Sequence, residues 1–149
     1  AKFVLHVHTD AGIAVASTKE GLLPISQHAL IALPNLAYHD YEGIALDLDE
    51  RERLVQDLGD KKALMLWNHG TLAVGETAAQ CWMMIFYLER ACAIQVMASA
   101  QGREHLRIAP EDAIETVKEQ QAIASGVGAM LAWPGCLRKL DRESPGYDS

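Results

Sequence analysis

The N-terminal segment of the chain reads Phe3-Val4-Leu5-His6-Val7-His8-Thr9. Its apolar and β-branched residues are typical of a strand. Residues i and i+2 of a strand project from the same face, roughly 7 Å apart along it, so His6 and His8 can converge on one ion. Taken alone, such a pair is also compatible with two ordinary half-buried histidines.

A third histidine lies in a predicted hairpin further along the chain. The apolar run Ala63-Leu64-Met65-Leu66-Trp67 breaks at Asn68-His69-Gly70 and resumes as Thr71-Leu72-Ala73-Val74. This pattern predicts a hairpin in which Gly70 supplies a backbone angle that other residues resist. If the hairpin packs beside the strand 3–8, the nitrogens of all three histidines meet.

Three histidines that converge in this way predict a metal site. Three neutral imidazoles with an open fourth position are the ligand set of a catalytic zinc rather than of a structural one. The candidate ligands are therefore His6, His8 and His69. An ion held by neutral ligands keeps its double positive charge and polarises carbonyl or hydroxyl oxygens strongly. The alternative is that the three histidines belong to the protein core and bind no metal.

Three motifs also carry a family resemblance: His6-Val7-His8-Thr9, the segment 67–75 (Trp-Asn-His-Gly-Thr-Leu-Ala-Val-Gly) and Tyr87-Leu88-Glu89-Arg90-Ala91-Cys92. Over roughly residues 3 to 102 the chain resembles the class II aldolase and adducin family. The resemblance implies that the same three histidines hold a divalent ion, usually Zn2+, with Mn2+ as another option. It also implies an α/β fold, a three-layer α/β/α arrangement whose central mixed sheet is largely antiparallel, with the metal at the strand ends.

The resemblance further implies a metal-dependent lyase. The expected reaction is aldolase-type cleavage of a carbon-carbon bond in a hydroxy-carbonyl sugar phosphate or hydroxy acid, through a metal-stabilised enediolate. Epimerases, dehydratases and decarboxylases use the same metal frame. The stretch 133–142, with Pro145 and Tyr147 after it, instead resembles a bacterial, adducin-related branch. A non-catalytic, adducin-like interaction module is therefore the alternative.

The amino-acid composition limits the number of domains and the kinds of partner that we expect. The 149 residues are 50% hydrophobic and 22% charged, which suits one globular domain over residues 1–149. In the family a further N-terminal portion carries the anion-binding loops and the catalytic carboxylate. We expect the acid-base residue to lie upstream of Ala1 and assign none here. The net charge is −7 and basic clusters are lacking, so nucleic acid and anionic membrane surfaces are poor partners. The resemblance implies a small-molecule substrate instead.

The three cysteines, Cys81, Cys92 and Cys136, predict reduced thiols. Cys81 and Cys92 share a predicted helix, where eleven residues at 1.5 Å rise place them roughly 16 Å apart, beyond disulfide reach. Free thiols, together with the lack of a recognisable signal peptide, predict a cytoplasmic protein.

Local patterns predict the remaining elements. Short helices are expected at 10–16 and 27–33, a strand at 35–39 and a charged helix at 48–58. A helix should open at Pro110 and run to about Ala124, where Gly126-Val127-Gly128 breaks it. A last short helix is expected to start near Pro134.

The longest helix is predicted over 77–101, with Thr77 and Gln80 forming a capping box and Gly102 ending it. Its first part, Cys81 to Leu88, is apolar on every side, which indicates burial on every side. We therefore expect a homo-oligomer, with a tetramer implied by the resemblance.

Three side-chain roles stay open at this point. Asp10 is either a helix N-cap, which we favour, or a group that orients a histidine. Glu89 is either a general base or, more commonly for such a residue, the partner of a nearby arginine. The cluster 38–43 either lines a site or forms a solvated turn, the more frequent case for a loop containing Gly43.

Overall fold

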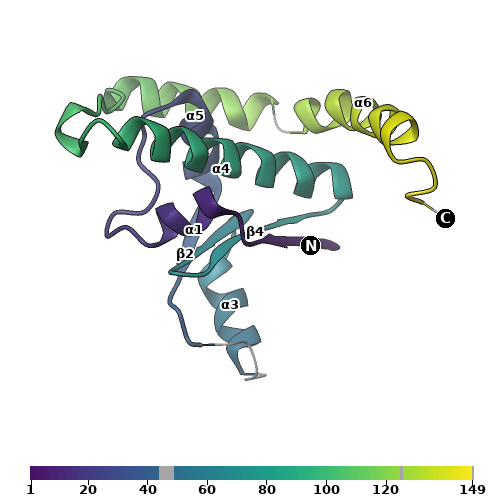
Figure 1. Cartoon of the computed structure of the whole chain (residues 1–149), viewed down its shortest axis with the longest axis horizontal. Helices are drawn as coiled ribbons and strands as arrows, with labels where there is room; N and C mark the ends of the chain where they lie inside the picture. The colour runs from purple at the N-terminus through teal and green to yellow at the C-terminus, as the bar shows by residue number, and fades with distance from the viewer. Residues whose placement is uncertain (44–48, 125, 149) are drawn as a thin grey trace.

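The computed structural model describes residues 1–43, 49–124 and 126–148. Within these ranges one four-stranded sheet has the order β1-β4-β3-β2 (Figure 1). Its strands are β1 (Phe3–Val7), β2 (Leu36–His39), β3 (Ala63–Leu66) and β4 (Gly70–Gly75). β4 pairs antiparallel with both β1 and β3, whereas β2 pairs parallel with β3. The sheet is therefore mixed and largely antiparallel, as predicted.

Helices lie on both sides of this sheet. α4 and α1 pack on one face, and α3 lies on the other side, against β2 (Figure 1). α2 packs on α4, α5 packs on α2, and α6 packs on α4. The bounds are α1 (Asp10–Ala16), α2 (Gln27–Ala32), α3 (Glu50–Leu58), α4 (Ala78–Ser99), α5 (Glu111–Ala124) and α6 (Val127–Glu143). The α/β/α layering predicted for the fold is thus confirmed.

The two faces of the sheet differ in how completely they are covered. On the α4 face, Met65 and Ala73 are fully buried in the core. On the opposite face, Leu64 and His39 are buried on the β2 and β3 side. Nδ1 of His39 lies 2.7 Å from Oδ2 of Asp57, which ties α3 to the sheet. Near β1 this face is open, since Val4 is 65% exposed there.

Leu88 is the side chain of α4 whose truncation we expect to destabilise the fold. It is fully buried in the core cluster. Leu88→Ala should lower the free energy of unfolding by about 3 kcal/mol, because it leaves a cavity that the packed neighbours fill only in part. Met97→Ala on the same helix is the control, since Met97 is 63% exposed. Urea denaturation followed by circular dichroism measures both, and equal losses in the two variants would contradict the assignment of Leu88 to the core.

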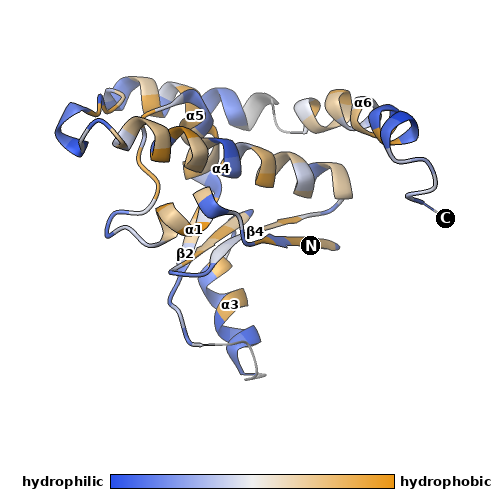
Figure 2. Cartoon of the chain, viewed as in Figure 1, coloured by the Kyte–Doolittle hydropathy of each residue, from blue (hydrophilic) through white to orange (hydrophobic). Residues whose placement is uncertain are grey.

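α4 is hydrophobic along much of its length (Figure 2), and several of its apolar side chains are exposed. Trp82 lies near Trp133 of α6, with ring centroids 6.1 Å apart, while Phe86 remains 40% exposed. Among the described residues, α4 alone is long and apolar enough to cross a membrane, a test that core helices of soluble proteins also pass. The predicted homo-oligomer stays a prediction.

Two helix starts differ in detail from the sequence-based expectation. The N-cap of α1 is Thr9, whose side-chain oxygen accepts from the backbone N–H of Gly12, so the assignment of the cap to Asp10 is wrong by one residue. Asp10 is instead the first helical residue, where a carboxylate suits the helix dipole. At α4, Thr77 caps as predicted, but Gln80 accepts from the N–H of Glu76.

The C-terminal helix is longer than predicted. α6 begins at Val127, directly after Gly126, which has a φ of +86°. Pro134 lies inside α6 and does not open a new helix. The expected helix start near Pro134 is therefore wrong. Proline costs the helix one backbone hydrogen bond, but the apolar contact of Trp133 with Trp82 of α4 favours one continuous helix.

Candidate metal centre

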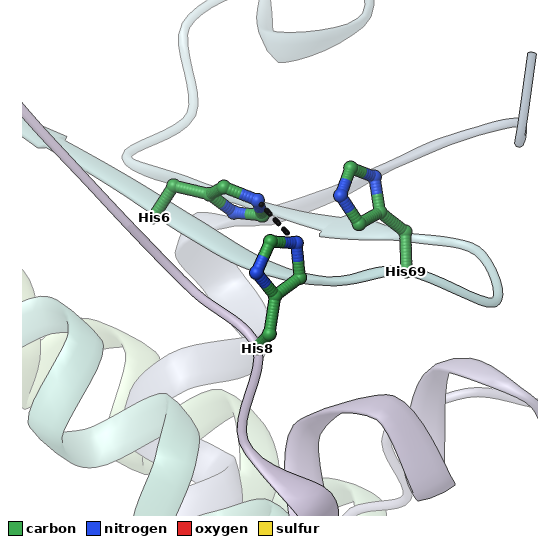
Figure 3. A group of neighbouring side chains, drawn as sticks. All are labelled: His6, His8 and His69. Atoms are coloured by element: carbon green, nitrogen blue, oxygen red, sulfur yellow. Dashed lines mark hydrogen bonds between the residues drawn. The ribbon is translucent and has the colours of Figure 1, made fainter. Parts of the chain in front are cut away.

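The three candidate histidines come together at one end of the sheet (Figure 3). His6 belongs to β1 and faces away from α4, opposite Leu72 of β4. His8 follows directly after β1, and His69 lies in the turn between β3 and β4. Ring centroids are 4.4 Å apart for His6 and His8, 4.9 Å for His6 and His69, and 4.7 Å for His8 and His69. The predicted neighbourhood of hairpin and first strand therefore brings the trio together.

The turn that carries His69 contains a residue with an unusual backbone conformation. Asn68 has a φ of +58°, the left-handed region that asparagine tolerates better than most residues. Its N–H donates to the carbonyl of Ala16, 3.0 Å away, which anchors the turn to the end of α1. The sequence-based assignment of the special backbone angle to Gly70 is wrong, because Asn68 adopts it.

Gly70 is required for a different reason, namely close approach between strands. A Cβ at this position would lie 2.5 Å from the carbonyl oxygen of Val7, and 3.4 Å and 3.5 Å from ring carbons of His8 and His6. Because glycine has no side chain, β4 can run directly beneath the segment that carries both histidines.

Hydrogen bonding prepares His6 as a ligand. Its Nδ1 lies 2.9 Å from the carbonyl oxygen of Thr71, an acceptor, so Nδ1 carries the proton. Nε2 is then the unprotonated nitrogen, and it lies 3.0 Å from Nε2 of His8. Two nitrogens bound to one tetrahedral zinc at 2.0–2.1 Å would be about 3.3 Å apart. The donor spacing and the tautomer of His6 thus fit a divalent ion.

His69 is favoured in its neutral, ligand-competent form. Partial burial lowers the pKa of its imidazole below the usual 6.5, and the neighbouring His6 and His8 lower this pKa further. One ring nitrogen from each of the three histidines lies within 4.8 Å of the others. Three imidazole nitrogens suit Zn, Cu, Fe or Ni rather than Mg or Ca, which prefer oxygen.

A cleft of about 660 Å³ adjoins the trio. Its lining includes Ser17, Thr18, Lys19, Asp40, Tyr41 and Asn68. Tyr41 connects the cleft with the trio, since its ring centroid lies 6.1 Å from that of His69. Part of the cluster 38–43 therefore lines a cavity beside the candidate site, which is the less frequent of the two outcomes expected for such a loop.

Comparison with known proteins decides the family. Residues 1–96 match the family described as "Class II Aldolase and Adducin N-terminal domain". The chain belongs to the class II aldolase and adducin family. It is 64% identical over 147 residues to a "Putative aldolase class 2 protein" of Caulobacter vibrioides, covering 99% of this chain and 57% of that protein. It is also 48% identical over 109 residues to mouse alpha-adducin, covering 71% of this chain and 15% of that protein.

Solved structures of class II aldolase relatives share the fold. An aldolase II superfamily protein from Pseudomonas syringae superposes with a TM-score of 0.91 at 47% identity, covering 98% of this chain and 59% of that one. An L-fuculose 1-phosphate aldolase from Glaciozyma antarctica gives a TM-score of 0.66 at 26% identity, covering 78% and 43%. The chain thus spans less than two thirds of the length of these aldolase-type relatives.

One acidic residue of this family member has partners that the sequence did not predict. The carboxylate of Glu89 on α4 accepts hydrogen bonds from the hydroxyls of Thr9 and Thr71. The expected pairing of Glu89 with an arginine is therefore wrong. A local sequence pattern could not predict these partners, because Thr9 lies 80 residues away from Glu89 along the chain. His39, which belongs to the cluster 38–43, is buried beside α3 and does not belong to the trio.

Proposed function

We propose that this chain is the metal-binding portion of a divalent-metal-dependent lyase, with His6, His8 and His69 as ligands of a zinc ion. The observation that carries the proposal is the convergence of three imidazoles, one in a tautomer set by Thr71, beside an open cleft. Three ligands leave a coordination position for substrate, as catalytic zinc sites require.

The expected reaction is aldolase-type cleavage of a carbon-carbon bond in a hydroxy-carbonyl compound. When bound, the ion would polarise adjacent carbonyl and hydroxyl oxygens of the substrate and stabilise the negative charge that develops on them. Side chains that line the cleft suit other groups of the substrate. The hydroxyl oxygens of Ser17 and Thr18, whose protons go to backbone carbonyls of α1, suit substrate hydroxyl donors, as does the amide of Asn68. The ammonium of Lys19 suits an anionic group such as phosphate.

The likeness to L-fuculose 1-phosphate aldolase supports a sugar phosphate as the substrate class. A second candidate, a non-catalytic interaction domain, is supported by the 48% identity to mouse alpha-adducin. Epimerisation, dehydration or decarboxylation on the same metal frame are further forms of the enzymatic proposal. The presence of all three histidines favours an enzyme, because a purely structural module needs no trio of converging ligands.

Turnover by the complete protein tests the proposal. The zinc-loaded protein is expected to cleave at least one member of a panel of hydroxy-carbonyl sugar phosphates, L-fuculose 1-phosphate among them, and hydroxy acids. Removal of the metal by a chelator should abolish the cleavage, and added Zn2+ or Mn2+ should restore it. Aldehyde products are measured with a coupled reductase. Tight metal binding without turnover of any compound on the panel would favour the adducin-like role.

A further inference from the structure

Glu89 lies at the point where three elements meet. It sits on α4, is partly buried, and each of its carboxylate oxygens accepts one hydroxyl. One hydroxyl belongs to Thr9, which links β1 to α1, and the other belongs to Thr71 of β4. A hydrogen bond to an ionised acceptor is stronger than one between neutral groups, so this carboxylate holds both threonines firmly.

Each of these threonines is directly connected to a histidine of the trio. Thr9 follows His8 in the chain. The carbonyl oxygen of Thr71 accepts from Nδ1 of His6 and thereby sets the tautomer of that imidazole. Glu89 therefore contacts both segments that position candidate ligands, and it does so through the two threonines and not through His6 or His8.

The pleat of the sheet separates Glu89 from the side where the imidazoles converge. Thr71 is paired with Val7, whose side chain packs against the core under α4. His6, the neighbour of Val7 in β1, projects from the opposite face. The carboxylate of Glu89, which accepts from the Thr71 hydroxyl, therefore lies on the α4 face of the sheet and does not face the cleft. This placement argues against the general-base role considered for Glu89 from the sequence.

Close packing at Gly12 restricts the position of the Glu89 carboxylate. A Cβ on Gly12 would lie 2.9 Å from Oε1 of Glu89 and 2.9 Å from the hydroxyl oxygen of Thr9. The same hydroxyl oxygen accepts from the N–H of Gly12 at 3.0 Å. α1 therefore packs directly on the bonded carboxylate, and this packing restricts any shift of Thr9.

We propose that Glu89 is a positioning residue of the metal centre, which sets the spacing of His6 and His8 through the hydroxyls of Thr71 and Thr9. The inference rests on the proposed metal-binding function of the trio and adds a residue that shapes the ligand set from the other face of the sheet. Removal of the carboxylate frees both threonines, so that the carbonyl of Thr71 no longer holds His6 in one orientation.

The test compares variants of the complete protein in two measurements that a purely structural role would not change. Zinc affinity is determined by competition with a chromogenic chelator, and the visible absorption of the Co2+-substituted protein reports the ligand geometry. Glu89→Leu removes both acceptors, and Glu89→Gln keeps one. Outer-shell partners of metal ligands are typically worth 10–100-fold in affinity, so we expect about tenfold weaker zinc binding for Glu89→Leu. Glu89→Gln should fall between Glu89→Leu and the parent.

Gln95→Leu on the same helix is the matched control. Gln95 is buried and bonds to the backbone of Leu23 and Gly21, at 2.7 Å and 2.8 Å. Its loss should lower the thermal midpoint of the metal-free protein and leave zinc affinity and the cobalt spectrum unchanged. If Glu89→Leu does not fold, Thr71→Val is measured in its place, because valine has the shape of threonine and replaces the hydroxyl that donates to Glu89 with a methyl group. It should weaken zinc binding several-fold.

The outcomes separate the two proposals. A parent protein that binds no zinc would overturn the proposed function and the inference with it. A parent that binds zinc, with Glu89→Leu and Thr71→Val both at parental zinc affinity and with parental cobalt spectra, would overturn the inference alone. Weaker zinc binding and altered spectra in these variants, but not in Gln95→Leu, would support it.

Discussion

Replacement of His8 by alanine is expected to abolish tight zinc binding while the protein stays folded. Binding free energies of about 10–16 kcal/mol for four-ligand zinc sites correspond to about 3 kcal/mol per ligand, so the loss of one imidazole should weaken binding by a factor of about 100 or more. His8 is exposed, and its removal opens no cavity in the core. Metal content after dialysis, a zinc titration and the thermal midpoint of the metal-free protein measure the effect.

His105→Ala is the matched control for this experiment. His105 is also an exposed histidine, with 68% of its side chain accessible, and it lies outside the trio in a short 3-10 helix. The control should keep parental zinc content. Stoichiometric zinc in His8→Ala, at parental affinity, would refute the assignment of His8 as a ligand. Loss of cleavage activity in His8→Ala alone would agree with a catalytic metal.

Gly70→Ala should damage both the fold and the metal centre. The added methyl group would lie 2.5 Å from the carbonyl oxygen of Val7, which is part of the backbone and cannot rotate away. β1 and β4 must therefore separate next to His6 and His8. Overpacking of this kind costs about 1–3 kcal/mol, and a backbone clash places Gly70→Ala at the upper end of that range. Zinc affinity should fall as well, because the strand that carries His6 shifts.

Gly135→Ala in α6 is the contrasting variant. The nearest atom to a Cβ at this position, outside the neighbouring residues and the local helix backbone, is a nitrogen of Arg138 at 3.7 Å, an ordinary contact. Alanine within a helix is about 1 kcal/mol more favourable than glycine, so the control should be as stable as the parent or more stable. Denaturant unfolding compares the two variants, and parental stability of Gly70→Ala would contradict the close approach of the strands.

Local sequence patterns were sufficient for the main elements and for the choice of candidate ligands. The strand at the N-terminus, the hairpin with His69 and the helix capped by Thr77 are each determined by residues a few positions apart. Hydrophobic period, turn residues and caps act over this range, so they can be recognised without coordinates. The three motifs also indicated the family, which the match over residues 1–96 confirms.

The parts that sequence analysis assigned wrongly depend on contacts between distant segments. Pro134 continues a helix that also packs Trp133 near Trp82, and Asn68 adopts the left-handed angle where its N–H reaches the carbonyl of Ala16. In both cases tertiary packing outweighs a local preference of one or a few kcal/mol.

The sequence by itself determined which residues could hold a metal, and the tertiary structure decided how they are held. The pairing of β1 with β4 brings His6 and His8 to the turn that carries His69, and it also places the Thr71 carbonyl beside His6. The contacts of Glu89 with Thr71 of β4 and with Thr9, which lies between β1 and α1, join α4 to both segments. Such contacts cannot be recognised in the linear sequence, because a partly buried carboxylate bonds to whichever donors the folded chain brings to it.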